Sequence, residues 1–277
     1  MKAIAFAPAH ITGFFEIFME EENAGSRGAG ICLSLGSYSF VEKIDEKKIY
    51  IEGNVGDGEV TKETIKNLRM NGVKIRILNE LPFSQGFGIS ASSSLSSSLA
   101  LCYLFNLPKI KAVEASHFAE IDSKTGLGDA VASYTGGIEI RKKPGLYGTI
   151  EKINYREKLI VAIVGKEIKT KEILDSRIVD KINEIGEECI KEFMKDKSLE
   201  NFFELSLKFS FETGLANEKM KNLLKKANKI GMAGMCMLGN SIFAIHSKKM
   251  KKFLSEYEYY ECFIDNEGAR ILASFFP

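Results

Sequence analysis

The chain lacks the sequence features of several protein classes. Its five cysteines are odd in number and no two are spaced C-x-x-C, which argues against a disulfide framework, a redox motif or a zinc knuckle. The three histidines are too far apart for a helix-borne H-E-x-x-H metal site. No apolar run reaches about 18 residues, and the start MKAIAFAPAHITG lacks the features of a secretory signal. We therefore expect no membrane span and a cytoplasmic location.

The charge balance argues against one class of partner. Lysine and arginine number 38, and aspartate and glutamate number 37, so the net charge is only +1. No global field favours polyanions, and we expect no nucleic acid as a partner. With 45% hydrophobic and 27% charged residues, the 277-residue chain has the composition of a globular protein with a packed core. The lysine-rich segments KKANK and SKKMKK are interpreted as solvated helix faces.

The order of the predicted elements indicates two domains. In the first half a helix is expected over about Thr61–Met70, among β-rich runs separated by glycine-marked turns: KAIAF, ICLSLGSYSFVEK, KKIYIEG and VKIRILN. In the second half a buried strand, KLIVAIVG, precedes amphipathic helices between about Ser176 and Ile230, and short strands follow. A boundary near residue 150 gives the domains 1–150 and 151–277.

A glycine loop followed by a serine-rich helix is the strongest chemical signal. In PFSQGFGISASSSLSSS, Gly86 and Gly88 let the backbone approach a ligand, and the helix that follows presents free N–H groups to an anion. The pattern is neither a P-loop, which needs Gly-Lys-Ser/Thr, nor a G-x-G-x-x-G dinucleotide loop. The structural alternative is a serine-capped helix with a flexible entry. Glycines combined with hydroxyls at a helix start favour phosphate binding.

Two further segments carry groups suited to phosphoryl transfer. Ala119–Gly137 holds the carboxylates Glu120, Asp122 and Asp129, which are suited to a hard divalent cation and to orienting a hydroxyl. The alternative is an acidic helix end, with Asp129 as an N-cap. The other segment, APAHITGFFEI, follows the first strand and offers His10 and Thr12 as hydrogen-bond donors. Taken alone, a histidine in such a place is more often structural.

Taken in chain order, three segments of the sequence resemble the three motifs of the GHMP kinase superfamily, which is named for galactose, homoserine, mevalonate and phosphomevalonate kinases. PAHITGFFE resembles the first motif, PFSQGFGISASS the second, and CMLGNSIFAI (Cys236–Ile245) a degenerate third. Within the superfamily the sequence is most similar to the archaeal pantoate kinases of coenzyme A biosynthesis. The segments that carry this likeness are PAHITGFFE, AGSRGAG, GFGISA, KTGLGD, GGIEIRKKPG, MLGNSIFA and TGL.

The resemblance implies a two-domain α+β fold, with an N-terminal domain like ribosomal protein S5 domain 2 and a C-terminal ferredoxin-like domain. It also implies transfer of the γ-phosphoryl group of ATP to the primary hydroxyl of pantoate, with Mg²⁺ as cofactor. The residues expected around the ATP phosphates are Gly86, Phe87, Gly88, Ile89, Ser90, Ala91 and Ser92. Ser90 and Glu120 match the family's magnesium-holding residues, and Asp129 matches its catalytic base.

The sequence departs from the family pattern near this base. Ile89 replaces the first serine of the second motif, and only Gly239 remains of the glycines of the third. His10 stands where mevalonate kinases carry a lysine that assists the aspartate, so a Lys–Asp pair requires Lys124 as a substitute.

Pantoate carries a carboxylate, so its site needs a cation. Arg27 and Arg141 are the candidates, because a guanidinium binds a carboxylate through two parallel hydrogen bonds, although a surface role is as plausible for each. His10 and Thr12 are expected to contact the acceptor's hydroxyls.

Other functions remain as alternatives. In one alternative the acceptor is homoserine, mevalonate or shikimate. In another the chain is a non-catalytic ligand-binding protein. A third, an RNA-binding module of the S5 type, is disfavoured by the charge balance. The C-terminal FFP and the habit of the family favour a homodimer.

Overall fold

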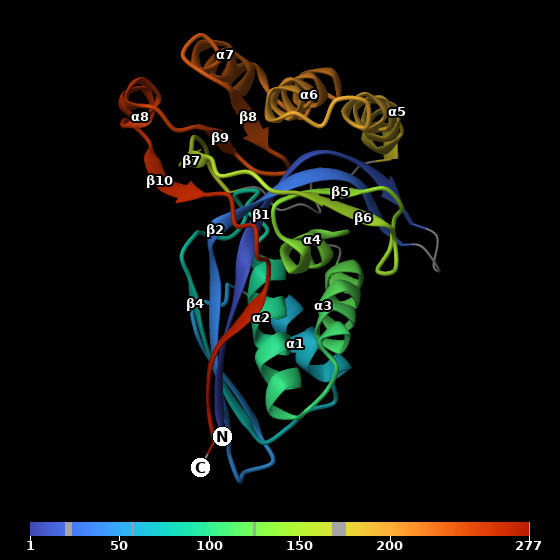
Figure 1. Cartoon of the computed structure of the whole chain (residues 1–277), viewed down its shortest axis with the longest axis vertical. Coiled ribbons are helices and arrows are strands. Elements are labelled where there is room, and N and C mark those ends of the chain that lie inside the picture. The colour runs from blue at the N-terminus through green and yellow to red at the C-terminus, as the bar shows by residue number, and fades with distance from the viewer. Residues whose placement is uncertain (20–23, 57, 124–125, 168–175, 277) are drawn as a thin grey trace.

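The computed structural model describes residues 1–19, 24–56, 58–123, 126–167 and 176–276. Within these ranges the chain forms two β-sheets with helices packed against them (Figure 1). The mixed α+β class expected from the sequence is confirmed. No helix in the described ranges is long and apolar enough to cross a membrane.

The first sheet has seven strands, with β11-β1-β2-β4-β3 in order and β5 and β6 continuing from β2. Its strands are β1 (Lys2–Phe18), β2 (Gly25–Lys43), β3 (Ile49–Gly53), β4 (Val73–Asn79), β5 (Ile138–Arg141), β6 (Ile150–Ile153) and β11 (Arg270–Phe275). The helices that follow its strands are α1 (Glu59–Asn67), α2 (Ile89–Leu104), α3 (Lys109–Ser123) and α4 (Asp129–Thr135). Figure 1 shows these helices gathered together beside the sheet.

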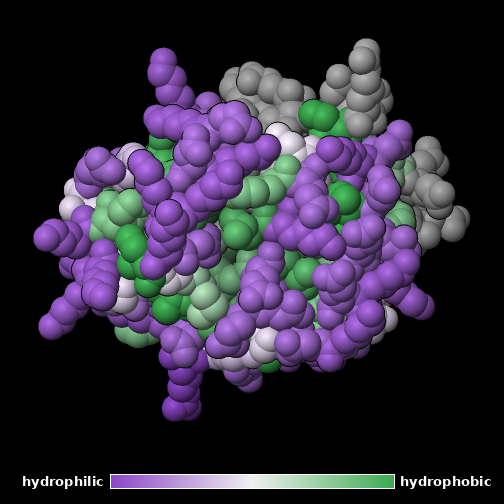
Figure 2. Space-filling model, turned by 90° about the horizontal axis from the view of Figure 1, so that it is seen from above, coloured by the Kyte–Doolittle hydropathy of each residue, from purple (hydrophilic) through white to green (hydrophobic). Residues whose placement is uncertain are grey.

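The second sheet has four strands in the order β10-β7-β9-β8. These are β7 (Lys158–Ile163), β8 (Ala233–Cys236), β9 (Ser241–Ile245) and β10 (Glu258–Phe263), and the associated helices are α5 (Ser176–Phe193), α6 (Leu199–Glu212), α7 (Glu218–Ala227) and α8 (Lys248–Leu254). Figure 2, seen from above these helices, shows mostly hydrophilic atoms with apolar atoms in the hollows between them. Lys225, Lys226, Lys248 and Lys249 are exposed, as predicted for solvated helix faces.

The first strand is longer than the sequence analysis expected. The segment Ala7–Ile17 was placed after this strand, but β1 continues through it because it pairs with β2 along nearly its whole length. The register shifts between residues 8 and 10 and again between residues 12 and 14. Such bulges change the direction in which side chains point. His10 and Thr12 therefore lie on an irregular part of β1 rather than after it.

Helix α2 is buried on nearly all sides although it is rich in serine. It lies between the first sheet and α3 (Figure 1). Its hydroxyls bond to backbone carbonyls one turn earlier and to serines of β2, as in the pairs Ser92–Ser37 at 2.6 Å and Ser96–Ser39 at 2.7 Å. Because the hydroxyls are satisfied in this way, a polar helix packs inside the protein without the cost of unpaired groups.

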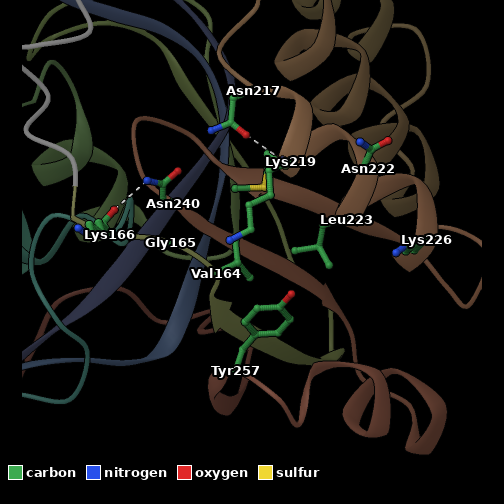
Figure 3. A pocket seen from close by; sticks show the side chains of 11 residues that line it. Val164, Gly165, Lys166, Asn217, Lys219, Asn222, Leu223, Lys226, Asn240 and Tyr257 are labelled. Atoms are coloured by element: carbon green, nitrogen blue, oxygen red, sulfur yellow. Dashed lines mark hydrogen bonds between the residues drawn. The ribbon is translucent and has the colours of Figure 1, made fainter.

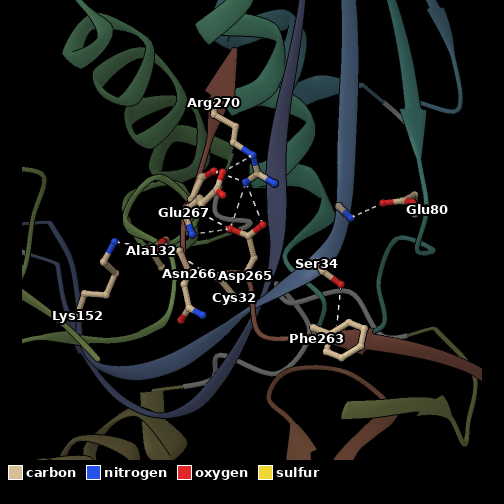
Figure 4. Close-up of polar contacts among 12 residues, drawn as sticks. Cys32, Ser34, Glu80, Ala132, Lys152, Phe263, Asp265, Asn266, Glu267 and Arg270 are labelled. Carbon is tan, nitrogen blue, oxygen red and sulfur yellow. Dashed lines mark hydrogen bonds and ion pairs between the residues drawn. The ribbon is translucent and has the colours of Figure 1, made fainter. Parts of the chain in front are cut away.

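After β10 the chain returns from the second sheet to the first (Figure 4). Asp265 lies at this crossing: its N–H donates to the Cys32 carbonyl at 2.9 Å and its own carbonyl accepts from Gly137 at 2.6 Å. Its carboxylate pairs with Arg270 at 2.9 Å, at the start of β11. The first sheet thus includes two strands, β6 and β11, that lie wholly or almost wholly beyond residue 150, and the domain boundary there stays a prediction.

Candidate active site

The glycine loop before α2 exposes backbone donors. Gly88 is the N-cap residue and has left-handed dihedral angles, with φ 61° and ψ 27°, which favour glycine. It has no side chain to accept from the N–H groups of the first turn, so the serine-capped alternative is not what forms here. Ser90 is partly exposed on that turn, whereas Ile89, Ala91 and Ser92 are buried. The start of α2 can therefore donate to an anion.

The turn after β8 supports this loop from the other sheet. A Cβ atom on Gly86 would lie 2.8 Å from the Cys236 carbonyl oxygen, and one on Gly239 would lie 2.2 Å from the carbonyl carbon of Gln85. Ser241 also donates to the Gln85 side chain at 3.2 Å. The degenerate third motif is thus in van der Waals contact with the glycine loop, and both glycines are needed for this close approach.

His10 connects the glycine loop to Asp129. Its backbone N–H donates to the Phe87 carbonyl at 3.0 Å, and its ring Nδ1 lies 2.8 Å from Asp129 Oδ1. On the other side of the ring, Nε2 lies 3.0 Å from Glu139 Oε1. Burial acts to lower the pKa of His10, but the hydrogen bonds to Asp129 and Glu139 raise it above its ordinary value.

Two carboxylates meet beside the loop that precedes α4. A Cβ atom on Gly126 would lie 2.3 Å from Glu120 Oε1 and 3.3 Å from Asp129 Oδ2, so both side chains point toward the same place. Glu120 also accepts from the N–H of Ala130 at 3.0 Å. Burial, and then the charge of Asp129, raises the pKa of Glu120 well above its ordinary value. Burial acts the same way on Asp129, but the hydrogen bond and charge of His10 lower its pKa.

The helical position of Asp129 differs from one sequence interpretation. Gly128 is the N-cap of α4, and Asp129 is the first helical residue. Its carboxylate is therefore not an N-cap acceptor but is held by His10, with a further hydrogen bond from Thr12. Asp122 is exposed on α3, and Lys124 lies outside the described residues.

The two candidate arginines have different surroundings. Arg27 donates from Nε to Glu16 at 2.5 Å. Arg141 is buried on β5 and donates from a terminal nitrogen to Glu139 at 2.5 Å, while its Nε has no hydrogen-bond partner in the described part of the chain. A Cβ atom on Gly128 would lie 3.1 Å from this Nε and 2.7 Å from the Ser26 hydroxyl. Arg141 therefore keeps a buried donor next to the Asp129 loop, and the Nε of Arg27 is already occupied.

Comparisons with known proteins show which family the chain belongs to. Residues 58–137 match the model of the GHMP kinases N terminal domain. The chain is 36% identical to a pantoate kinase of Methanocaldococcus jannaschii. The alignment spans 252 residues and covers 88% of this chain and 93% of that protein. It is 31% identical to a pantoate kinase of Thermococcus kodakarensis, over 91% of each protein. The chain belongs to the pantoate kinase family.

Solved structures support the fold of this pantoate kinase family member. A structure described as a phosphotransferase related to the CoA biosynthesis pathway matches with a TM-score of 0.88 and 30% identity, over 98% of both chains. The Methanococcus jannaschii mevalonate kinase matches with a TM-score of 0.69 and 19% identity, over 95% of this chain and 98% of that one, which shows the fold alone. The two-domain GHMP kinase fold expected from the sequence is confirmed. Membership of a kinase family implies the use of ATP.

Sequence reasoning missed three side chains that this family member brings to the site. Ser26 lies in the AGSRGAG segment, and Glu139 lies next to Arg141 in the strand segment GIEIRK. His117 is buried on α3, where burial and then the charge of Arg141 lower its pKa to about 4. Its Nδ1 has no hydrogen-bond partner among the described residues. For Glu139 a signal existed, because a carboxylate within a short apolar strand requires a buried cationic partner.

A separate groove lies on the side of the second sheet (Figure 3). It has a volume of about 500 Å³ and is lined by α7, Tyr257, Asn240 and the segment 164–166. Lys166, Lys219 and Lys226 border it and are exposed. None of the residues singled out from the sequence as catalytic, metal-binding or substrate-binding lines this groove, so it is not the site described above.

Proposed function

We propose that this enzyme transfers the γ-phosphoryl group of ATP to the primary hydroxyl of pantoate, which gives 4-phosphopantoate. The observation that carries the proposal is the contact of His10 with both the glycine loop and Asp129, because it brings a phosphate-binding backbone next to a carboxylate. The identity to pantoate kinases over most of the chain supports pantoate as the acceptor.

The phosphates of ATP are proposed to lie against the N–H groups of residues 86–92, at the positive end of the α2 dipole. Ser90 and Glu120 would hold Mg²⁺. The described residues contain no group of three His, Cys, Asp or Glu side chains able to bind a metal. One serine and one carboxylate fit Mg²⁺, which commonly takes one or two protein ligands and completes its shell with water and phosphate oxygens. When bound, Mg²⁺ would neutralise charge on the transferred phosphoryl group.

Asp129 is proposed to orient the hydroxyl of the acceptor and to take its proton. Its lowered pKa keeps it ionised at neutral pH, so it can accept this hydrogen bond. An acid with so low a pKa is a weak base, and its contribution comes mainly from position.

The carboxylate of pantoate is proposed to bind to Arg141, whose buried Nε lies next to the Asp129 loop. Arg27 is the second candidate. Thr12, which hydrogen-bonds to Asp129, is proposed to contact a hydroxyl of the acceptor. A homodimer completes the proposal, because Leu272 and Phe275 are exposed on the edge strand β11. Light scattering in solution tests this last point.

Assays with alternative acceptors test the function. Purified protein is incubated with ATP and Mg²⁺ and, separately, with pantoate, homoserine, mevalonate or shikimate. We expect ADP release and a new phosphomonoester signal in phosphorus NMR with pantoate only. Faster turnover of another acceptor would assign the enzyme to that substrate. No turnover with any acceptor, together with retained ATP binding, would favour the non-catalytic alternative.

A further inference from the structure

Glu139 is a buried carboxylate to which the proposed function has so far given no role. It lies on β5 and is 0% exposed. Its Oε1 accepts from the terminal nitrogen of Arg141 at 2.5 Å and lies 3.0 Å from Nε2 of His10. Its Oε2 has no hydrogen-bond partner among the described residues. One oxygen atom thus contacts both the histidine beside Asp129 and the arginine beside the Asp129 loop.

The backbone leaves a passage for this contact. Gly30 on β2 pairs with Thr12 of β1 on one side and with Glu139 of β5 on the other. A Cβ atom on Gly30 would lie 2.1 Å from Nε2 of His10. Only glycine therefore lets the imidazole ring cross β2 to reach Glu139, which indicates that the contact is part of the architecture.

The position of the ring between two carboxylates defines its charge. A carboxylate accepts hydrogen bonds, so each ring nitrogen must carry a proton to bond to one, and a histidine with both nitrogens protonated is an imidazolium. The groups that face it on the packed elements are Asp129 of α4, Glu139 and Arg141 of β5, Cys32 of β2 and, beyond Asp129, Glu120 of α3. Burial raises the pKa of Cys32 well above its ordinary value, so this thiol is neutral.

We propose that Glu139 is a positioning residue that holds His10 as an imidazolium at neutral pH against Asp129 and, through the same oxygen, fixes the orientation of Arg141. This rests on the proposed function. An imidazolium has no lone pair to accept a proton, so the hydroxyl proton of the acceptor goes to Asp129 and not to His10. His10 thereby supplies the positive charge for which the sequence offered Lys124, and Glu139 links the two ends of the acceptor site.

The protonation state of His10 is measured without any substrate. Nitrogen-15 NMR of histidine-labelled protein, with the His10 signals assigned by their loss in His10→Gln, reports both ring nitrogens. We expect both to be protonated at neutral pH in the natural protein. In Glu139→Gln the proton leaves at lower pH, because removing the carboxylate charge lowers the pKa of His10. A neutral tautomer in the natural protein at neutral pH overturns the proposal even if the enzyme phosphorylates pantoate and even if the variant fails to fold.

Kinetics separate positioning from a merely structural role. We expect Glu139→Gln to lower kcat with pantoate about tenfold or more and to raise the KM for pantoate, while the KM for ATP changes by less than about twofold. As pH rises, the activity of this variant should be lost at a lower pH than the activity of the natural enzyme. Glu151→Gln is the control. Glu151 lies on the neighbouring strand β6 and pairs with Lys142 and Lys197, so its substitution should leave rate and pH profile unchanged. An unchanged kcat and pH profile in Glu139→Gln overturns the proposal.

Discussion

The candidate site has two parts that are built in different ways. One is the glycine loop, and the other is the His10 network, which consists of His10, Asp129, Glu139 and Arg141. We propose that the loop binds the nucleotide through backbone groups, whose positions are set by residues adjacent in sequence, with Gly88 in a left-handed conformation directly before α2. The network consists of side chains from three elements, and its two histidine contacts join residues 119 and 129 positions apart. Substitutions in the network should therefore affect the chemical step and the acceptor, and substitutions in the loop should affect the nucleotide.

Asp129→Ala gives the largest expected effect and the sharpest test of this division. We expect kcat to fall about 10²–10⁴-fold, the range for a positioned acid or base, with the KM for ATP changed by less than about twofold. Steady-state assays with each substrate varied in turn measure both. Asp122→Ala is the control, since Asp122 is exposed on α3. Equal losses in turnover and in nucleotide affinity would mean that Asp129 is structural.

Substituting each arginine separately tests which one binds the acceptor. Arg141→Lys should raise the KM for pantoate about 10–100-fold, because the fork that binds a carboxylate is lost. Arg27→Lys should raise it by less than about threefold, since the Nε of Arg27 is held by Glu16. Thermal unfolding of both variants checks that the fold is kept. The reverse order of effects would move the carboxylate site to Arg27.

A pair of glycines tests the loop. Gly88→Ala and Gly214→Ala both place an alanine in a left-handed conformation, with φ of 61° and 80°, which costs about 1–2 kcal/mol of stability in each case. At Gly88 the new Cβ would also lie 3.1 Å from the His10 carbonyl oxygen, whereas at Gly214 nothing lies within 4 Å. We therefore expect the KM for ATP to rise about fivefold in Gly88→Ala only. The same rise in both variants would show that strain alone is responsible.

The smallest expected effect is on stability, which Glu120→Gln should raise rather than lower. The raised pKa of Glu120 means that folding disfavours its charge, so stability is lost as pH rises above the ordinary value of a glutamate. Glutamine cannot ionise, so we expect the free energy of unfolding at neutral pH without Mg²⁺ to rise by about 0.5–2 kcal/mol. Denaturant unfolding across pH measures this. A variant less stable than the natural protein would show that the carboxylate is well compensated.

The difference between the glycine loop and the His10 network also explains which features could be predicted from the sequence. The loop, its helix and the strands around them follow from local patterns, such as Gly86 and Gly88 before a helical run. The fold and the family followed from the ordered motifs. The network could not be deduced locally, because the approach of Glu139 to His10 depends on the register of three strands and on a glycine, Gly30, in the middle one. The extension of β1 was missed for a related reason, since two bulges interrupt its alternation.

The return of β11 to the edge of β1 has a consequence for synthesis on the ribosome. Until residues 270–275 have emerged, one edge of β1 has no strand beside it, and the first sheet cannot reach its final form. The amino-terminal part of the nascent chain must therefore wait for a segment made much later, with an open β-edge that invites aggregation or the help of a chaperone.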